Sequence, residues 1–156
     1  VASIVASHFA PEWVLNIKET GQVWLVDYSS PSNPVIKMIE AERFLHDGGW
    51  DSTKRYFLVA ANARNKIAVI DAKEKKLTAL IDTGGLKPYP GGGANCFEPE
   101  FGPVWASGYI GDRVVSLIGT EPENHPESAW KMIWKTKSLS SGKLFIKTHP
   151  NSKWVW

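Results

Sequence analysis

Short apolar runs recur along the chain, each ended by turn residues, and they predict an all-β protein. The runs are rich in β-branched and aromatic residues, which suit a pleated, half-buried surface. The predicted strands span residues 2–7, 13–18, 23–28, 35–39, 56–60, 66–71, 76–82, 103–107, 113–118, 129–134, 144–147 and 153–156. The one helical pattern, residues 40–43, is too short to be stable.

One strand phrase occurs three times. Residues 21–27, 65–71 and 111–117 have the same apolar pattern, roughly 45 residues apart. A period in the forties made only of strands is typical of a β-propeller with four strands per blade. A β-sandwich also has many short strands, but it does not repeat one phrase. The sequence therefore predicts nearly three blades and the first strands of a fourth.

A histidine or tyrosine precedes the second strand of each repeat. These residues are His8, His46, Tyr89 and His149. Because equivalent positions of successive blades surround the central channel, we expect the four rings to gather at one end of it. This is where a propeller holds its site.

His46 is the strongest candidate among them. Imidazole can donate and accept a proton near neutral pH. Asp47 could orient the ring or could cap a turn. Gly48 and Gly49 would permit positive φ and the close approach of a flat ligand, so a polar turn is predicted here. A histidine that only bonds its local backbone is the alternative.

Other unusual features predict packing and loops. The glycine-rich segment 85–95 is not followed by a helix, which argues against a phosphate-binding loop and favours a loop over the channel mouth. Cys96 is expected to be a small, partly buried residue. Five tryptophans are expected to fill space between blades, namely Trp13, Trp24, Trp50, Trp105 and Trp130.

Composition excludes several classes of protein. The chain has 156 residues, 43% of them hydrophobic and 22% charged, which is typical of one globular domain. A net charge of +2 with scattered lysines gives no sign of a nucleic-acid partner. One cysteine allows neither an internal disulfide nor a Cys-x-x-Cys motif. No apolar run could span a membrane. The chain begins without Met and ends within a strand pattern, so we expect part of a longer protein.

Several phrases resemble the haem d1 domain of cytochrome cd1 nitrite reductase, along residues 1–156. They are found at residues 16–21, 44–50, 55–57, 60–66, 101–105, 117–120 and 144–152. The resemblance implies an eight-bladed propeller with haem d1 at its centre, of which this chain would supply about three four-stranded blades. The proximal iron ligand would lie outside this stretch.

The resemblance also implies an activity. Members of the family are periplasmic homodimers that reduce nitrite to nitric oxide in denitrification. Haem c in a separate N-terminal domain feeds the electron, which comes from a small c-type cytochrome or a cupredoxin. The isolated chain is expected to be inactive, because the ring would be open and the axial ligand absent.

Site residues follow from matching the family's motifs. His46 matches the first distal histidine, a proton donor and nitrite ligand, whereas Tyr89 stands at the second. Gly92 stands where an arginine pairs with the haem carboxylates, and Cys96 and Gly108 also depart from the family's pattern. A phenol is neutral at pH 7 and would bond nitrite without attracting it as imidazolium does. A lost arginine–carboxylate bond costs about 1.5–3 kcal/mol, so weaker haem retention and slower turnover are expected.

Two other functions remain open. A propeller of haem d1 biosynthesis would bind the haem without reducing nitrite. The altered loop favours this reading, whereas the closely matching phrases elsewhere favour the reductase. A non-enzymatic scaffold would take up no haem.

Overall fold

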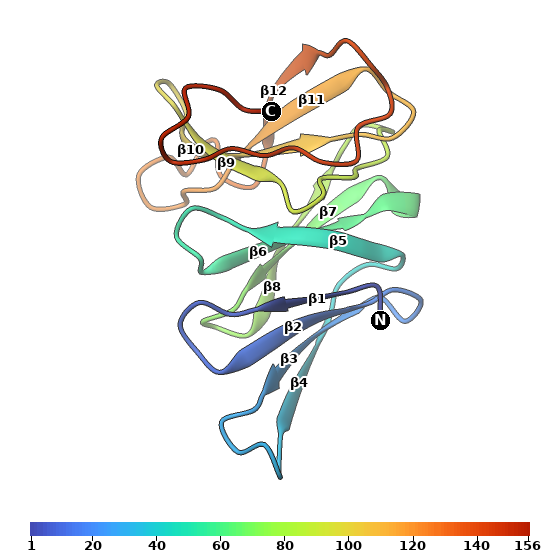
Figure 1. Cartoon of the computed structure of the whole chain (residues 1–156), viewed down its shortest axis with the longest axis vertical. Coiled ribbons are helices and arrows are strands. Elements are labelled where there is room, and N and C mark those ends of the chain that lie inside the picture. The colour runs from blue at the N-terminus through green and yellow to red at the C-terminus, as the bar shows by residue number, and fades with distance from the viewer.

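The computed structural model describes residues 1–156 as three four-stranded antiparallel sheets stacked along the long axis of the molecule (Figure 1). The first sheet comprises β1 (Ser3–Ala6), β2 (Glu12–Ile17), β3 (Gln22–Asp27) and β4 (Val35–Glu40). The second comprises β5 (Leu45–Trp50), β6 (Tyr56–Ala61), β7 (Lys66–Asp71) and β8 (Lys76–Asp82). The third comprises β9 (Ala94–Glu98), β10 (Gly102–Gly108), β11 (Val114–Gly119) and β12 (Met132–Lys137). One 3-10 turn, Asn62–Arg64, is the only helical element, so no helix could cross a membrane.

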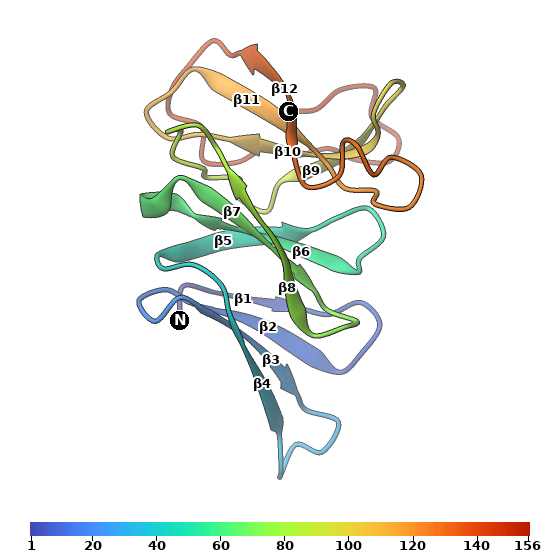
Figure 2. The ribbon, with the colours of Figure 1, turned by 180° about the vertical axis from the view of Figure 1, so that it is seen from behind.

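Each sheet is a simple meander, because strand order in space follows strand order in the sequence. The first strands, β1, β5 and β9, lie on the side facing the viewer in Figure 1. The last strands, β4, β8 and β12, come forward in Figure 2. Side-by-side meanders that share one edge in this way are the blades of a propeller, with the first strands toward the channel.

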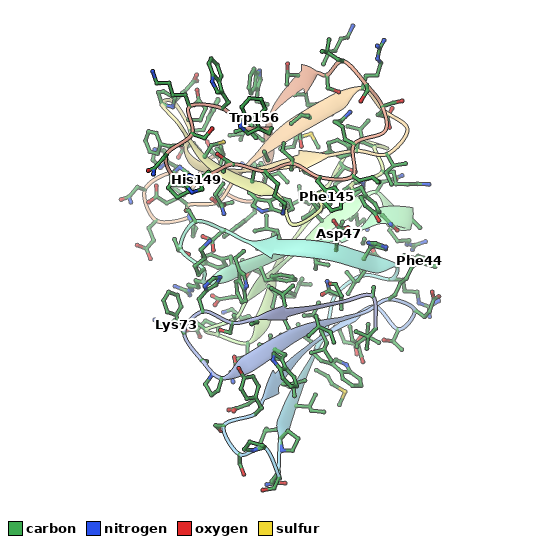
Figure 3. The ribbon with its side chains drawn as sticks, viewed as in Figure 1. Phe44, Asp47, Lys73, Phe145, His149 and Trp156 are labelled. Carbon is green, nitrogen blue, oxygen red and sulfur yellow. The ribbon has the colours of Figure 1, made fainter.

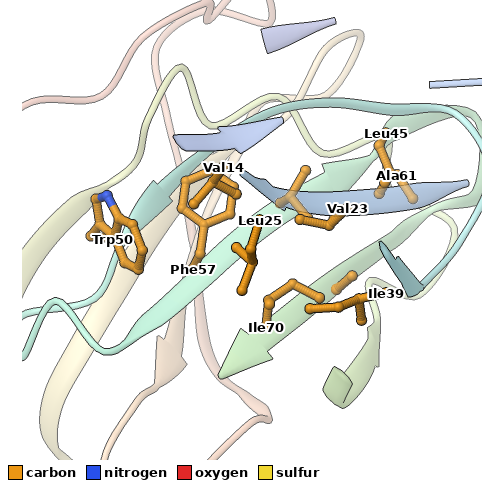
Figure 4. Close-up of a cluster of buried hydrophobic side chains, with 11 residues drawn as sticks. Val14, Val23, Leu25, Ile39, Leu45, Trp50, Phe57, Ala61 and Ile70 are labelled. Atoms are coloured by element: carbon orange, nitrogen blue, oxygen red, sulfur yellow. The ribbon is translucent and has the colours of Figure 1, made fainter. Parts of the chain in front are cut away.

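The core between the first two sheets explains the alternating pattern of β2 and β3. Val14, Val23 and Leu25 are buried from the first sheet, and they pack against Phe57 and Ile70 of the second (Figure 4). The residues between them in sequence point to the other face of the first sheet. Since one face of this sheet is covered and the other is not, buried and more exposed residues alternate along β2 and, for most of its length, along β3.

The middle sheet is covered on both faces, and β6 is therefore a continuous apolar run that is buried throughout. Its second face contacts the third sheet through Leu58 and Val69, which pack with Trp105 and Ile118. Trp130 packs against this second cluster. The predicted packing role of Trp50 and Trp105 is confirmed, since both are buried between sheets.

The two outer faces of the stack differ. On the first sheet, Ile4, Trp13, Ile36 and Met38 are exposed by 61%, 44%, 45% and 56%. On the third sheet, the final segment crosses the outer face and buries Ile146 against it (Figure 3). The outer face of the first sheet is therefore uncovered, whereas the final segment covers part of the outer face of the third sheet.

Several predicted strand positions were wrong. The segments 45–50 and 94–98 are strands that the polar and glycine-rich patterns concealed, and β12 begins three residues later than predicted. Residues 144–147 and 153–156 form no strand of a fourth sheet. They lie against the third sheet, and only Lys147 and Trp156 exchange backbone hydrogen bonds, of 2.8 and 2.7 Å.

Candidate functional site

A β-bulge at the start of β5 places the first candidate side chain. The pairing of β5 with β6 slips between Leu45 and Gly48, so that His46 and Asp47 lie opposite Ala60 alone. A bulge of this kind bends the strand and re-aims its side chains. The predicted polar turn is therefore wrong.

The neighbouring blade holds the backbone of this bulge. The carbonyl of His46 accepts hydrogen bonds from Ser3 Oγ and Asn16 Nδ2, both at 3.1 Å. Asn16 Nδ2 also donates to Ser3 Oγ at 2.7 Å. Because a bulge interrupts the ladder within its own sheet, a buried carbonyl there needs a partner from elsewhere. The first sheet supplies two.

Asp47 orients the imidazole. His46 Nδ1 lies 3.1 Å from Asp47 Oδ1, and Asp47 Oδ2 accepts from the backbone N–H of Gly91. An ionised carboxylate can only accept, so Nδ1 carries the proton of this bond. Nε2 has no protein partner, and the side chain is 32% exposed. The Asp47 carboxylate thus links the His46 ring, in the second sheet, to the loop that leads into the third sheet.

The second candidate lies beside the first. The rings of His46 and Tyr89 have centroids 4.9 Å apart and planes tilted by 40°. The backbone N–H of Tyr89 donates to the carbonyl of Gly108 at 3.0 Å, and the Tyr89 phenol bonds no other side chain. An imidazole Nε2 and a phenol O–H therefore stand free at one end of β5.

Tyr109, the residue that follows β10, anchors this arm of the loop. Pro88 forms an isolated bridge with Tyr109, whose side chain is fully buried. The Tyr109 hydroxyl lies 2.6 Å from Ser116 Oγ, and burial raises the pKa of Tyr109 to about 12. This phenol stays neutral and serves as an anchor for the loop that carries Tyr89.

Glycines let the loop approach β5 backbone to backbone. Gly91, Gly92 and Gly93 have φ of 56°, 95° and 69°, in the left-handed region that favours glycine. A Cβ on Gly49 would collide with the carbonyl of Gly92, although Gly49 itself has no positive φ. The expected positive φ at Gly48 and Gly49 was wrong. Glycine is needed in β5 because another backbone passes close to it.

Two predicted rings lie elsewhere. His8 packs edge-on against Trp50 with centroids 6.0 Å apart, at the far end of β5 from His46. His149 is exposed, and Figure 3 shows it well away from Asp47. His8 comes after the inner strand β1, whereas His46 lies at the start of the inner strand β5. The two histidines therefore lie at opposite ends of the row of inner strands. The prediction that all four rings gather at one end was wrong.

Sequence reasoning missed the residues that fix the site. Three hydrogen bonds could not be recognised from the sequence, because each joins two different blades. They are the bonds of Ser3 and Asn16 to the His46 carbonyl, and the bond of the Gly91 N–H to Asp47. The glycine pair in β5 facing the glycine triplet was the available signal of a close backbone approach. No group of three or more His, Cys, Asp or Glu side chains is placed to hold a metal ion.

The stacked four-stranded meanders are blades of a β-propeller, and the paired rings of His46 and Tyr89 lie beside the first strand of the middle blade. The model of the cytochrome D1 heme domain matches residues 1–156, and the chain belongs to that family. A nitrite reductase of Stutzerimonas stutzeri is 56% identical over 161 aligned residues. The match covers 100% of this chain and 29% of that protein, so this chain spans under a third of its relative.

Solved structures support the fold. Hydrazine synthase of Kuenenia stuttgartiensis matches with a TM-score of 0.74 at 13% identity, over 97% of this chain and 40% of that one. Dihydro-heme d1 dehydrogenase NirN in complex with DHE matches with a TM-score of 0.72 at 22% identity, over 93% and 29%. At these identities the likeness concerns the fold alone.

Proposed function

We propose that this chain is part of an NO-forming nitrite reductase that reduces nitrite at haem d1. The observation that carries the proposal is a pair of unpartnered polar groups in a haem d1 family domain: the Tyr89 phenol, and His46 Nε2, which donates when the imidazole is protonated. The identity of 56% to a nitrite reductase along the whole chain supports the same activity. Residues 1–156 would form part of the haem-binding propeller.

The residues present fit the face of a haem at which an anion binds. The Tyr89 phenol is a neutral hydrogen-bond donor, and His46 Nε2 donates when the imidazole is cationic. No carboxylate adjoins them other than Asp47, which is already bonded twice. Haem d1, when bound, supplies one electron to nitrite. His46 and Tyr89 would contact the haem and the nitrite on it, and the residue that binds the iron would come from another part of the protein.

His46 would act as the proton donor. Nitrite, two protons and one electron give nitric oxide and water, so an oxygen of nitrite must be protonated before it leaves as water. With Nδ1 fixed against Asp47, protonated His46 presents Nε2–H to that oxygen and attracts the anion. Tyr89 would donate a hydrogen bond without charge.

The experiment compares the full-length protein that carries this chain with its His46→Ala variant, by a nitric oxide electrode and by haem absorption. We expect nitric oxide from the unaltered protein and a loss of about 10²-fold or more in the variant, the usual contribution of a positioned acid. The exposed His8, varied to Ala, serves as the control. Haem uptake without nitric oxide formation by the unaltered protein would overturn the proposal.

One observation favours a second function, a haem d1-binding propeller of d1 biosynthesis. Tyr89 and Gly92 replace a histidine and an arginine of the family's motif, which weakens the site for an anion. Tyr89→His in the full-length protein should then raise nitrite turnover and haem retention, whereas Gly92→Arg would also strain a backbone with φ of 95° and press on Lys147. If Tyr89→His changes neither, this departure does not limit the site. A protein without any haem uptake would be a scaffold.

The remaining parts of the proposal concern the whole protein. The open apolar face of β1–β4 supports further blades on that side, in an eight-bladed ring. By family, haem c would lie in a separate domain, and the protein would be a periplasmic homodimer that accepts electrons from a small c-type cytochrome or a cupredoxin.

A further inference from the structure

Lys147 occupies the place that a side chain on Gly92 would take. Its ammonium donates a hydrogen bond to the carbonyl of Gly91 at 2.8 Å. A Cβ on Gly92 would lie 2.9 Å from Lys147 Nζ, which is closer than real Cβ contacts. A cation is therefore present at this point of the loop, although Gly92 itself carries none.

The pocket beside this cation contains positive groups and no acid. About 480 Å³ in volume, it lies between β9 and the final segment and is lined by Lys54, Lys147 and His149 among other residues. None of its lining residues is Asp or Glu. Neither lysine forms an ion pair anywhere in the structure. Two unpaired ammonium groups facing one pocket are the donors that an anionic group requires.

The position of Lys147 connects this pocket to the paired rings. Gly91, whose carbonyl binds Lys147, donates its N–H to Asp47, and Asp47 holds His46. Lys147 thus binds the same loop residue, Gly91, whose N–H is bonded to the carboxylate that orients the imidazole. A flat ligand that contacts His46 and extends along β5 would bring its acidic edge toward Lys147.

We propose that Lys147 binds a carboxylate of the haem, with Lys54 at the other side of the same pocket, and so supplies the positive charge that Gly92 lacks. This inference rests on the proposed function. Lysine offers a point charge, and the carbonyl of Gly91 fixes where that charge lies. The ligand would cover the exposed ammonium, so the charge-assisted bond would form away from bulk water.

The test titrates haem d1 into the full-length protein and follows the visible absorption. Lys147→Met should weaken binding about tenfold, the size of one charge-assisted hydrogen bond, while Lys147→Arg should keep most of the affinity. Lys137→Met, which removes an exposed lysine from β12, is the matched control and should change nothing. The loss should shrink as salt is raised.

Haem d1 with methyl-esterified carboxylates separates recognition of the ligand from support of the loop. The unaltered protein and Lys147→Met should bind the ester equally. An equal loss with the ester would overturn the inference, because Lys147 would then act only through Gly91. Unchanged affinity of Lys147→Met for haem d1 would overturn it as well. No uptake by the unaltered protein would overturn the proposed function and this inference together.

Discussion

Asp47→Asn is the change that most directly probes how the site is built. Asp47 accepts from two donors at once, His46 Nδ1 at 3.1 Å and the N–H of Gly91. Asparagine has the same shape but offers one oxygen and one NH₂ group. A ring with its proton on Nδ1, or a protonated ring, then leaves one of the two donors facing another donor whichever way the amide turns. The tautomer with its proton on Nε2 accepts from the amide NH₂, but the charged partner is lost. The substitution therefore weakens the link between the ring and the loop.

The expected size follows from burial and charge. A hydrogen bond to a charged group contributes about 1.5–3 kcal/mol, and the Asp47 side chain is 18% exposed, so we expect the lower end, about 1.5 kcal/mol. If the ring and the loop must be ordered to hold haem d1, the apparent dissociation constant rises roughly tenfold. Visible titration of the full-length protein measures it.

The control and the refuting result are equally direct. Glu19→Gln removes an exposed carboxylate that forms no ion pair, and it should leave the titration unchanged. An Asp47→Asn protein that binds haem d1 within twofold of the unaltered one, with the same thermal midpoint, would show that the link from His46 to Gly91 does not order the site.

Three further predictions concern stability and reactivity. Burial acts to raise the pKa of Asp71, but the Arg55 guanidinium and backbone N–H donors outweigh it and lower the pKa, so unfolding followed by tryptophan fluorescence should set in as the pH falls below about 4. Gly49→Ala should cost at least about 1–3 kcal/mol in urea unfolding, because its Cβ meets the carbonyl of the facing loop. Burial raises the pKa of the Cys96 thiol, so alkylation by iodoacetamide at pH 7 should be much slower in the folded protein than in urea.

Each of these has a control within the chain. Asp71→Asn should flatten the loss of stability at low pH, and an unchanged profile would contradict the role of that carboxylate. Gly142→Ala places a Cβ in open space without positive φ and should be nearly neutral. Equal costs at Gly142 and Gly49 would refute the argument from close approach. Alkylation of Cys96 at the same rate in both states would contradict its shielding.

The fold was largely predictable because its repeats carry one pattern. The repeated phrase predicted β3, β7 and β11. The inner strands were harder. The middle of β5 consists of polar residues and glycine, since Gly49 touches the backbone of the loop that leads to the next blade. Such a strand has little side-chain pattern, and only pairing in three dimensions reveals it.

The site was predictable in part, for a related reason. The structure brings together His46 and Tyr89, which the sequence singled out, but it separates His8 and His149 from them. Position in a repeat indicates which blade a residue belongs to. It does not tell which end of the inner strand the side chain occupies, because a shift of a few residues moves it from one end of the channel side to the other.

His46 is held by contacts with both neighbouring blades, which limits how the blades of this domain can be exchanged. Its carbonyl is held by Ser3 and Asn16 of the first sheet, and its ring is held through Asp47 by the loop that leads into the third. Exchange of the middle blade alone would transplant the imidazole without either support. The smallest transferable unit of this site is therefore three consecutive blades, and duplication or loss of a single blade would erase the site even where every residue of the blade survived.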